Sequence, residues 1–123
     1  MSAIAERFAC LKERGETAFI PYVTAGDPDL ETTKAIVVEM ARRGADVIEL
    51  GIPFSDPLAD GPTIQASSQR ALDKGATLEG IFGCAEDIRK ETDVPIIIFS
   101  YYNPVHRYGL EAFVNRCVDV GVD

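Results

Sequence analysis

Hydrophobic residues along the chain follow two patterns in turn: helical intervals, which predict helices, and short apolar runs, which predict strands. In residues 2–14, apolar side chains recur at helical intervals, with Ile4, Phe8 and Leu11 on one side and Gly15 positioned to end the helix. Three short apolar runs then predict strands at residues 18–23, 46–50 and 94–100. Helical patterns between and after them predict helices at residues 28–43, 62–74, 78–91 and 109–120. This alternation, with no internal repeat or low-complexity linker, predicts a parallel sheet built from βα units.

Two of the helix starts carry specific signals. Asp27 precedes Pro28, so we expect a capping side chain followed by a proline at the first helical position. Thr77 is expected to cap the helix that begins at Leu78. Three of the predicted helices have an apolar side that should face the sheet; its residues are Leu30, Val37, Met40, Ala41, Leu78, Ile81, Phe82, Ala85, Ile88, Phe113, Val114, Cys117 and Val118.

The two faces of the second predicted strand differ in polarity. Its period of two places Val47 and Glu49 on one face and Ile48 and Leu50 on the other. The fully apolar pair should meet the helices, so Glu49 should point to the inner face, near the carboxyl end of the strand. The third strand carries the continuous apolar run Ile96–Phe99, which is typical of a strand buried on both faces.

Composition describes a globular chain and narrows its partners. Of the 123 residues, 46% are hydrophobic and 26% are charged. No apolar stretch approaches the roughly 18 residues of a membrane span and no secretory leader is visible, so we expect a cytoplasmic protein. The net charge of −8 argues against nucleic-acid binding. An anionic substrate would need local backbone donors, although the chain contains no glycine-rich phosphate fingerprint.

Cysteine and histidine suggest no metal site. Cys10, Cys84 and Cys117 are widely spaced and each falls in a predicted helix, so we interpret them as reduced packing residues. His106, the only histidine, follows the third strand in a predicted loop, without partners for a catalytic triad. We expect it to lie on the surface.

Two acids are candidates for chemistry. Glu49 stands inside an apolar strand, where an ionised and unpaired carboxylate costs several kcal/mol, so it serves either acid/base catalysis or a structural hydrogen bond. Asp60 precedes Gly61 and Pro62 and is either a second functional acid or a partner of a helix N-terminus. The prolines of the intervening loop restrict its backbone and so lower the entropy cost of presenting Asp60 in one place.

Two further residues remain open on sequence alone. Asp56, between Ser55 and Pro57, suits a solvated turn as well as a contact with a partner. Tyr22, on the first strand, suits a core position as well as a ligand contact.

Three segments resemble one known family. Residues 50–62, Leu-Gly-Ile-Pro-Phe-Ser-Asp-Pro-Leu-Ala-Asp-Gly-Pro, are similar nearly residue for residue to the signature of tryptophan synthase alpha subunits. Residues 21–28 resemble that family's first strand and loop, and residues 101–104 resemble the loop after its third strand. The resemblance extends along the whole chain.

The resemblance implies a (β/α)8 TIM barrel lyase of tryptophan biosynthesis, which cleaves indole-3-glycerol phosphate to indole and glyceraldehyde 3-phosphate. In such an enzyme Glu49 would carry out the proton transfers, and Asp60 would stabilise the positive charge that develops on the indole ring. Tyr22 and Ile64 would line the indole pocket. The helix of residues 2–14 would close the barrel at the end away from the active site.

The same resemblance implies a partner, the tryptophan synthase beta subunit, in an alpha2-beta2 heterotetramer that passes indole between subunits. Pro53, Asp56 and Pro57, with Asn103 and Pro104, would form the contact surface, and Asp56 would offer its carboxylate to a lysine of the partner. No metal or organic cofactor is implied for the lyase step. Pyridoxal phosphate is expected only on the beta subunit.

Length limits what this chain can form. A barrel of eight βα units needs about 250 residues, and the chain has 123. We therefore expect residues 1–123 to be the N-terminal part of a single barrel domain, with only the first three βα units, and to be inactive alone. Alternatives are another phosphate-binding barrel, an isomerase or synthase, and a non-catalytic subunit that activates another enzyme.

Overall fold

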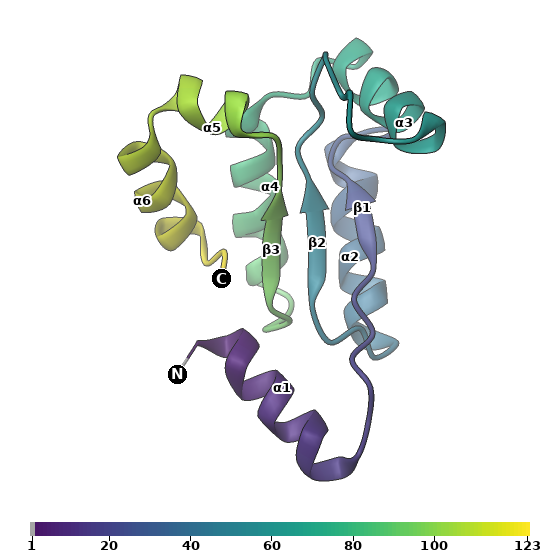
Figure 1. Cartoon of the computed structure of the whole chain (residues 1–123), viewed down its shortest axis with the longest axis vertical. Helices are drawn as coiled ribbons and strands as arrows, with labels where there is room; N and C mark the ends of the chain where they lie inside the picture. Colours follow the sequence, from purple (N-terminus) through teal and green to yellow (C-terminus); the bar gives the residue numbers. More distant parts are fainter. Residues whose placement is uncertain (1) are drawn as a thin grey trace.

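The structure, a computed structural model, describes residues 2–123. Within them, strands and helices alternate and the three strands form one parallel sheet in the order β1-β2-β3 (Figure 1). The elements are α1 (Ala3–Arg14), β1 (Tyr22–Thr24), α2 (Leu30–Arg42), β2 (Ile48–Gly51), α3 (Pro62–Asp73), α4 (Leu78–Arg89), β3 (Ile96–Phe99), α5 (Tyr102–Tyr108) and α6 (Leu110–Val120). The predicted parallel sheet of βα units is confirmed.

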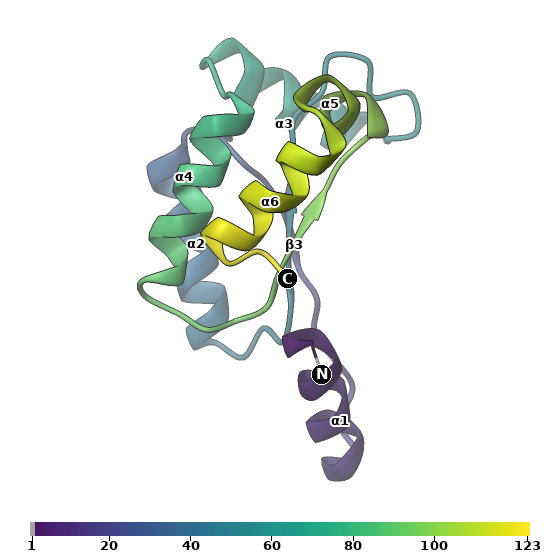
Figure 2. The ribbon, with the colours of Figure 1, turned by 90° about the vertical axis from the view of Figure 1, so that its left-hand side faces the viewer.

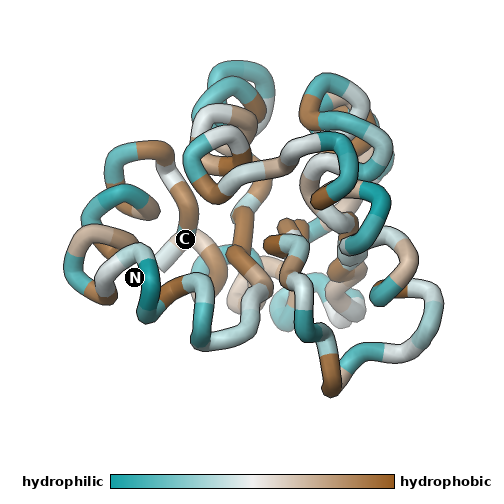
Figure 3. The backbone as a smooth tube through the Cα atoms, turned by 90° about the horizontal axis from the view of Figure 1, so that it is seen from above, coloured by the Kyte–Doolittle hydropathy of each residue, from teal (hydrophilic) through white to brown (hydrophobic). Residues whose placement is uncertain are grey.

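The core lies between the sheet and the helices that follow each strand. Helices α2 and α4 lie together on one side of the sheet (Figure 2). Ile48 and Leu50 of β2 are fully buried there against Ile81 and Phe82 of α4, as the alternation predicts. Seen from above, hydrophobic segments lie in the middle of the molecule as well as on some outer turns (Figure 3). The opposite face of the sheet carries Glu49, with Tyr22, Ile97 and Phe99 from the neighbouring strands.

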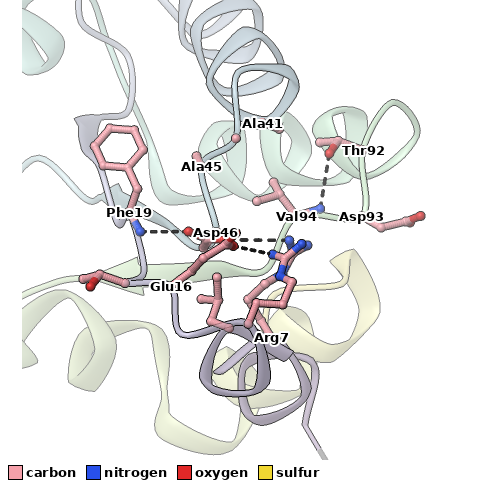
Figure 4. Close-up of a pocket in the computed structure, with 13 residues that line it drawn as sticks. Arg7, Glu16, Phe19, Ala41, Ala45, Asp46, Thr92, Asp93 and Val94 are labelled. Atoms are coloured by element: carbon pink, nitrogen blue, oxygen red, sulfur yellow. Dashed lines mark hydrogen bonds and ion pairs between the residues drawn. The ribbon is translucent and has the colours of Figure 1, made fainter. Parts of the chain in front are cut away.

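Helix α1 lies at the amino ends of the strands (Figure 1). There the Asp46 carboxylate accepts a hydrogen bond from the Phe19 backbone N–H at 2.8 Å and forms an ion pair with Arg7 of α1 at 3.7 Å (Figure 4). A hollow of about 620 Å³ separates α1 from this end of the sheet, with Leu11 and Val94 among its lining residues. The helix thus lies at the end away from the carboxyl ends of the strands, as the barrel resemblance implies.

The inner face of β2 is covered at its amino end. The alternation places Val47 on this face with Glu49, and Val47 is fully buried. Asp46, its neighbour, is tied to Phe19 and Arg7, so the amino end of this strand is covered from below. Only the carboxyl half of the inner face stays open.

The first strand begins later than predicted. The pattern predicts residues 18–23, and β1 runs from Tyr22 to Thr24. Backbone pairing nevertheless starts earlier, because the Phe19 carbonyl accepts from Asp46 N–H and the Pro21 carbonyl accepts from Glu49 N–H, both at 2.9 Å. Pro21 has no N–H to donate, so a regular ladder begins only after it.

The predicted start of α2 is wrong. The capping residue is Asp29, whose carboxylate accepts from the Thr32 N–H at 2.7 Å, and the helix begins at Leu30. The Asp27-Pro28 peptide bond is cis, and the Asp27 side chain instead accepts two hydrogen bonds from the Arg70 guanidinium. The Thr77 cap, in contrast, is confirmed, because its hydroxyl accepts from the Gly80 N–H at 3.1 Å.

Residues after β3 also differ from expectation. The predicted loop that holds Asn103, Pro104 and His106 is helix α5. Proline is tolerated in a first helical turn, where no intrahelical N–H bond is required, so Pro104 does not prevent this helix. His106 is exposed, as expected.

The apolar faces of α6 and β3 are less covered than predicted. Phe113 and Cys117 pack against the core, whereas Val114 is 51% exposed and Val118 is 71% exposed. Phe99 of β3 is 50% exposed. These side chains lie at the β3 side of a sheet whose edge has no neighbouring strand within residues 2–123.

The three cysteines lie in helices and are free thiols. Burial raises the pKa of the Cys84 thiol to about 11 and also raises the pKa of Cys117, so both stay protonated and act as packing residues. Cys10 is exposed, which corrects its expected packing role.

Candidate active site

Glu49 lies on the open face of the sheet, towards the carboxyl end of β2. Its Cα pairs with Tyr22 of β1 on one side and with Ile97 of β3 on the other. These three side chains share one face because partners in register point the same way. Glu49 is half-buried, so its carboxylate borders both the protein and the open side of the sheet.

The aromatic ring of Tyr22 crosses from β1 onto β2. It lies over Gly51, where a β-carbon would overlap both the ring and the hydroxyl. Gly51 pairs with Phe99 in register, and the Tyr22 and Phe99 rings meet edge to face with their centroids 5.8 Å apart. The missing side chain at Gly51 therefore allows two aromatic residues to meet across the middle strand.

The loop between β2 and α3 is held by short internal hydrogen bonds. Asp60 N–H donates to the Pro57 carbonyl at 3.0 Å, and Leu58 N–H donates to the Asp56 carbonyl at 2.8 Å. A further tie comes from Tyr101, whose hydroxyl accepts from the Ala59 N–H at 3.0 Å. The loop thus presents Asp60 in a defined place next to the end of β3.

Asp60 does not cap α3. The capping position is Gly61 and no side chain bonds to the first turn of that helix. The Asp60 backbone carbonyl accepts from Gln65 Nε2 at 2.8 Å, while its carboxylate makes no hydrogen bond within residues 2–123. The structure therefore does not have the alternative arrangement, in which the Asp60 side chain would be the partner of a helix N-terminus.

The electrostatics of Tyr22 bring these residues together. Burial raises the pKa of the Tyr22 hydroxyl, and the carboxylates of Asp60 and Glu49 raise it further, against an opposing hydrogen bond from Thr24. Glu49 and Tyr22 are partners in register, and Asp60 lies in the loop between the carboxyl end of β2 and the start of α3. The three residues therefore lie towards the carboxyl ends of the strands.

Ile64 lies on α3, one turn after Asp60, and is half-buried. Its carbonyl accepts from the Ser67 hydroxyl at 2.9 Å, and Ser67 in turn contacts Thr24. Sequence reasoning missed Gly51, Thr24, Ser67 and Tyr101. Only Tyr101 carried a usable signal, as an aromatic residue directly after a strand.

The expected partner-binding residues are brought together from two segments. Pro53 and Asp56 of the loop and Asn103 and Pro104 of α5 line one hollow of about 700 Å³. Pro57 is not among its lining residues, although it belongs to the same loop. The Asp56 side chain is exposed and accepts from the Ser55 hydroxyl at 2.9 Å.

Residues 2–123 lack two further features. They contain no cluster of three or more His, Cys, Asp or Glu side chains placed to hold a metal ion. In that same part of the chain, no helix has the length and apolar character needed to cross a membrane.

A parallel sheet of βα units, with α2 and α4 on one face and acids towards the carboxyl ends of its strands, is typical of a part of a protein of the β/α-barrel class. The comparisons with known proteins specify it further. Residues 8–123 match the family model described as tryptophan synthase alpha chain, so the chain belongs to this family.

Two relatives match this chain over its whole length. The chain is 56% identical over all its residues to the tryptophan synthase alpha chain of Citrifermentans bemidjiense and 55% identical to that of Alkaliphilus metalliredigens, and it covers 46% of each. It therefore spans about half the length of these relatives and corresponds to an N-terminal portion of the family's (β/α)8 barrel, with three βα units.

Two solved structures also match nearly all of this chain. The alpha subunit of Legionella pneumophila has a TM-score of 0.97 and 38% identity, over 100% of this chain and 47% of that one. The tryptophan synthase of Mycobacterium tuberculosis has a TM-score of 0.94 and 31% identity, over 99% of this chain and 49% of that one. The fold predicted from the resemblance is confirmed.

Proposed function

We propose that these residues form the N-terminal part of a single barrel domain that cleaves indole-3-glycerol phosphate to indole and glyceraldehyde 3-phosphate. The observation that carries the proposal is the grouping of Glu49, Asp60 and Tyr22 at the carboxyl ends of the strands. Active sites of β/α barrels lie at this end. Membership of the tryptophan synthase alpha chain family supports this lyase over another phosphate-binding isomerase or synthase.

The proposed roles follow from the chemistry of the retro-aldol cleavage. The carbon–carbon bond breaks when the indole C3 gains a proton and the adjacent glycerol hydroxyl loses one. Glu49 is proposed to transfer these protons, since its carboxylate is half-buried beside the open face. Asp60 is proposed to accept from the indole N–H and to stabilise positive charge on the ring. Tyr22 and Ile64 would contact the flat apolar ring.

A second subunit belongs to the same proposal. Pro53, Asp56, Asn103 and Pro104 share one hollow at the end of the molecule that carries the acids, and Pro57 restricts the backbone of the loop beside it. We expect this surface, with Pro57, to dock on a beta subunit in an alpha2-beta2 assembly. Pyridoxal phosphate would belong to that subunit, and the assembly would be cytoplasmic.

The test needs a complete barrel. Residues 1–123 can be joined to the remaining residues of the Citrifermentans bemidjiense alpha chain, which is 56% identical over this part; we name this protein the completed chain. Glu49→Gln in the completed chain is expected to lower the rate of indole release on the order of 10²–10⁴-fold with little change in substrate binding. Residues 1–123 alone are expected to be inactive.

Asp60→Asn separates function from folding. It should lower indole release and leave the melting temperature unchanged, because Asp60 caps no helix. A Glu49→Gln variant with normal turnover would remove Glu49 from the mechanism. A completed chain that releases no indole but still activates a beta subunit would point to the non-catalytic alternative.

A further inference from the structure

Asp60 is placed by the backbone of a short turn, because its carboxylate has no hydrogen-bond partner within residues 2–123. The turn runs from Pro57 to Asp60 and is closed by the Asp60 N–H, which donates to the Pro57 carbonyl at 3.0 Å. We name residues 57–60 the acid turn. Leu58, at its tip, is 92% exposed, so the turn gains little support from packing. Side chains of neighbouring elements must therefore decide where Asp60 lies.

Gln65 holds the acid turn from the side of α3. Its side-chain amide donates to the Asp60 carbonyl at 2.8 Å and, more weakly, to the Pro57 carbonyl at 3.4 Å. Both partners are carbonyl oxygens, so the NH2 group of the amide faces them. The Gln65 backbone N–H donates to the Gly61 carbonyl at 3.0 Å. Gln65 thus ties the first and last residues of the acid turn to a helix.

Tyr101 holds the acid turn from the side of β3. Its hydroxyl accepts from the Ala59 N–H at 3.0 Å. Its ring packs against the ring of Phe54, with the centroids 5.3 Å apart and an interplanar angle of 34°. Phe54 lies in the same loop, three residues before the acid turn, so Tyr101 contacts this loop at two points.

The two supports come from separate elements and act next to Asp60. Tyr101 binds the N–H of Ala59, Gln65 binds the carbonyl of Asp60, and the Asp60 N–H is bound within the acid turn. The backbone that carries the Asp60 side chain is therefore fixed from both sides. A carboxylate on a fixed backbone loses less conformational freedom when a ligand donates to it.

We propose that Gln65 and Tyr101 are positioning residues that act through Asp60, by holding its carboxylate in place for the indole N–H. The inference rests on the proposed lyase function and adds two residues to it. Asp60 is proposed to stabilise charge that develops on the ring, so a displaced carboxylate weakens the transition state more than the bound substrate. Loss of either support should lower kcat more than it raises KM.

Gln65→Met and Tyr101→Phe in the completed chain test the proposal. Gln65→Met keeps the length of the side chain and removes its N–H donors, whereas Tyr101→Phe keeps the ring against Phe54 and removes the hydroxyl. Each should lower kcat about 2- to 10-fold, the range for one hydrogen bond, with a smaller change in KM. Gln65→Glu should lower kcat further than Gln65→Met, because a carboxylate of the same size would face two carbonyl oxygens.

The chain offers a matched control for each variant. Gln69→Met removes a side-chain amide from the same helix, where it donates to the Asp73 carboxylate at 2.8 Å. Tyr102→Phe removes the hydroxyl next to Tyr101 in sequence; Tyr102 is 63% exposed, and its ring packs on His106. Both control variants should leave kcat and KM unchanged.

A double-mutant cycle with Asp60→Ala separates positioning of this acid from support of the fold. Once the carboxylate is absent, Gln65→Met and Tyr101→Phe should have no further effect on kcat. Amide hydrogen exchange followed by NMR gives a second readout that needs no activity. The Ala59 N–H should exchange faster in Tyr101→Phe, and the Asp60 N–H should exchange faster in Gln65→Met.

The outcomes are distinguishable. Unchanged kcat in Gln65→Met or in Tyr101→Phe, in a completed chain that Glu49→Gln inactivates, would overturn the role of that residue and leave the lyase function standing. An effect that persists in the Asp60→Ala background would do the same, as would unchanged exchange of the two amides. A completed chain that releases no indole would overturn the proposed function and this inference with it.

Discussion

The close contact between Tyr22 and Gly51 gives the most direct test of how the site is built. Gly51 has ordinary strand backbone and pairs with Thr24 and Phe99 on either side. Alanine suits such backbone better than glycine by about 0.5–1 kcal/mol. A β-carbon at this position would, however, overlap the Tyr22 ring. Gly51→Ala is therefore a steric probe of the placement of Tyr22.

The expected magnitude follows from these two opposing effects. Forcing a methyl group into a filled space costs typically about 1–3 kcal/mol, and here it would also separate the Tyr22 and Phe99 rings, now 5.8 Å apart. With Tyr22→Ala the space is empty, so Gly51→Ala should be neutral or stabilising in that background. The difference between the two backgrounds should be about 1–3 kcal/mol.

The assay is urea unfolding of the completed chain followed by circular dichroism, in wild type, both single variants and the double variant. Indole release measured in parallel should fall in Gly51→Ala, because Tyr22 is displaced from beside Glu49. Equal changes in unfolding free energy for Gly51→Ala with and without Tyr22→Ala would refute the contact and, with it, the described arrangement of the inner face.

Two further predictions concern the scaffold. Thr77→Ala should lower the unfolding free energy of the completed chain by about 1 kcal/mol, because the Thr77 hydroxyl caps α4, and Thr77→Ser should not; equal losses would exclude the cap. Hydrogen bonds from Arg70 lower the pKa of the Asp27 carboxyl, so the stability that Arg70→Met removes should be present at pH values above the ordinary aspartate pKa and disappear as pH falls below it. Urea midpoints measured between neutral and acidic pH check this, and a wild-type advantage that persists in strong acid would contradict it.

Local patterns predicted the elements well where one physical signal dominated. The period-two alternation in β2 identified Ile48 and Leu50 as the residues that pack against the helices, and it placed Glu49 on the opposite face. The Thr77 cap followed from a single side chain. The predicted start of α2 was wrong because Asp27 and Asp29 carry the same capping signal. Only the structure shows that the Asp27 carboxylate binds Arg70, far along the sequence, while Asp29 caps the helix.

The sequence by itself determined the parallel βα architecture, the acid on a strand and the stiff proline loop, because periodicity and backbone restriction are local properties. Only the tertiary structure decided which residues meet. Strand register places Tyr22 beside Glu49 and lets its ring cross Gly51, and the packing of α3 brings Ser67 to Thr24, 43 residues away in sequence. Such contacts depend on how separate helices and strands are aligned in space, and the spacing of residues along the sequence does not reveal that alignment.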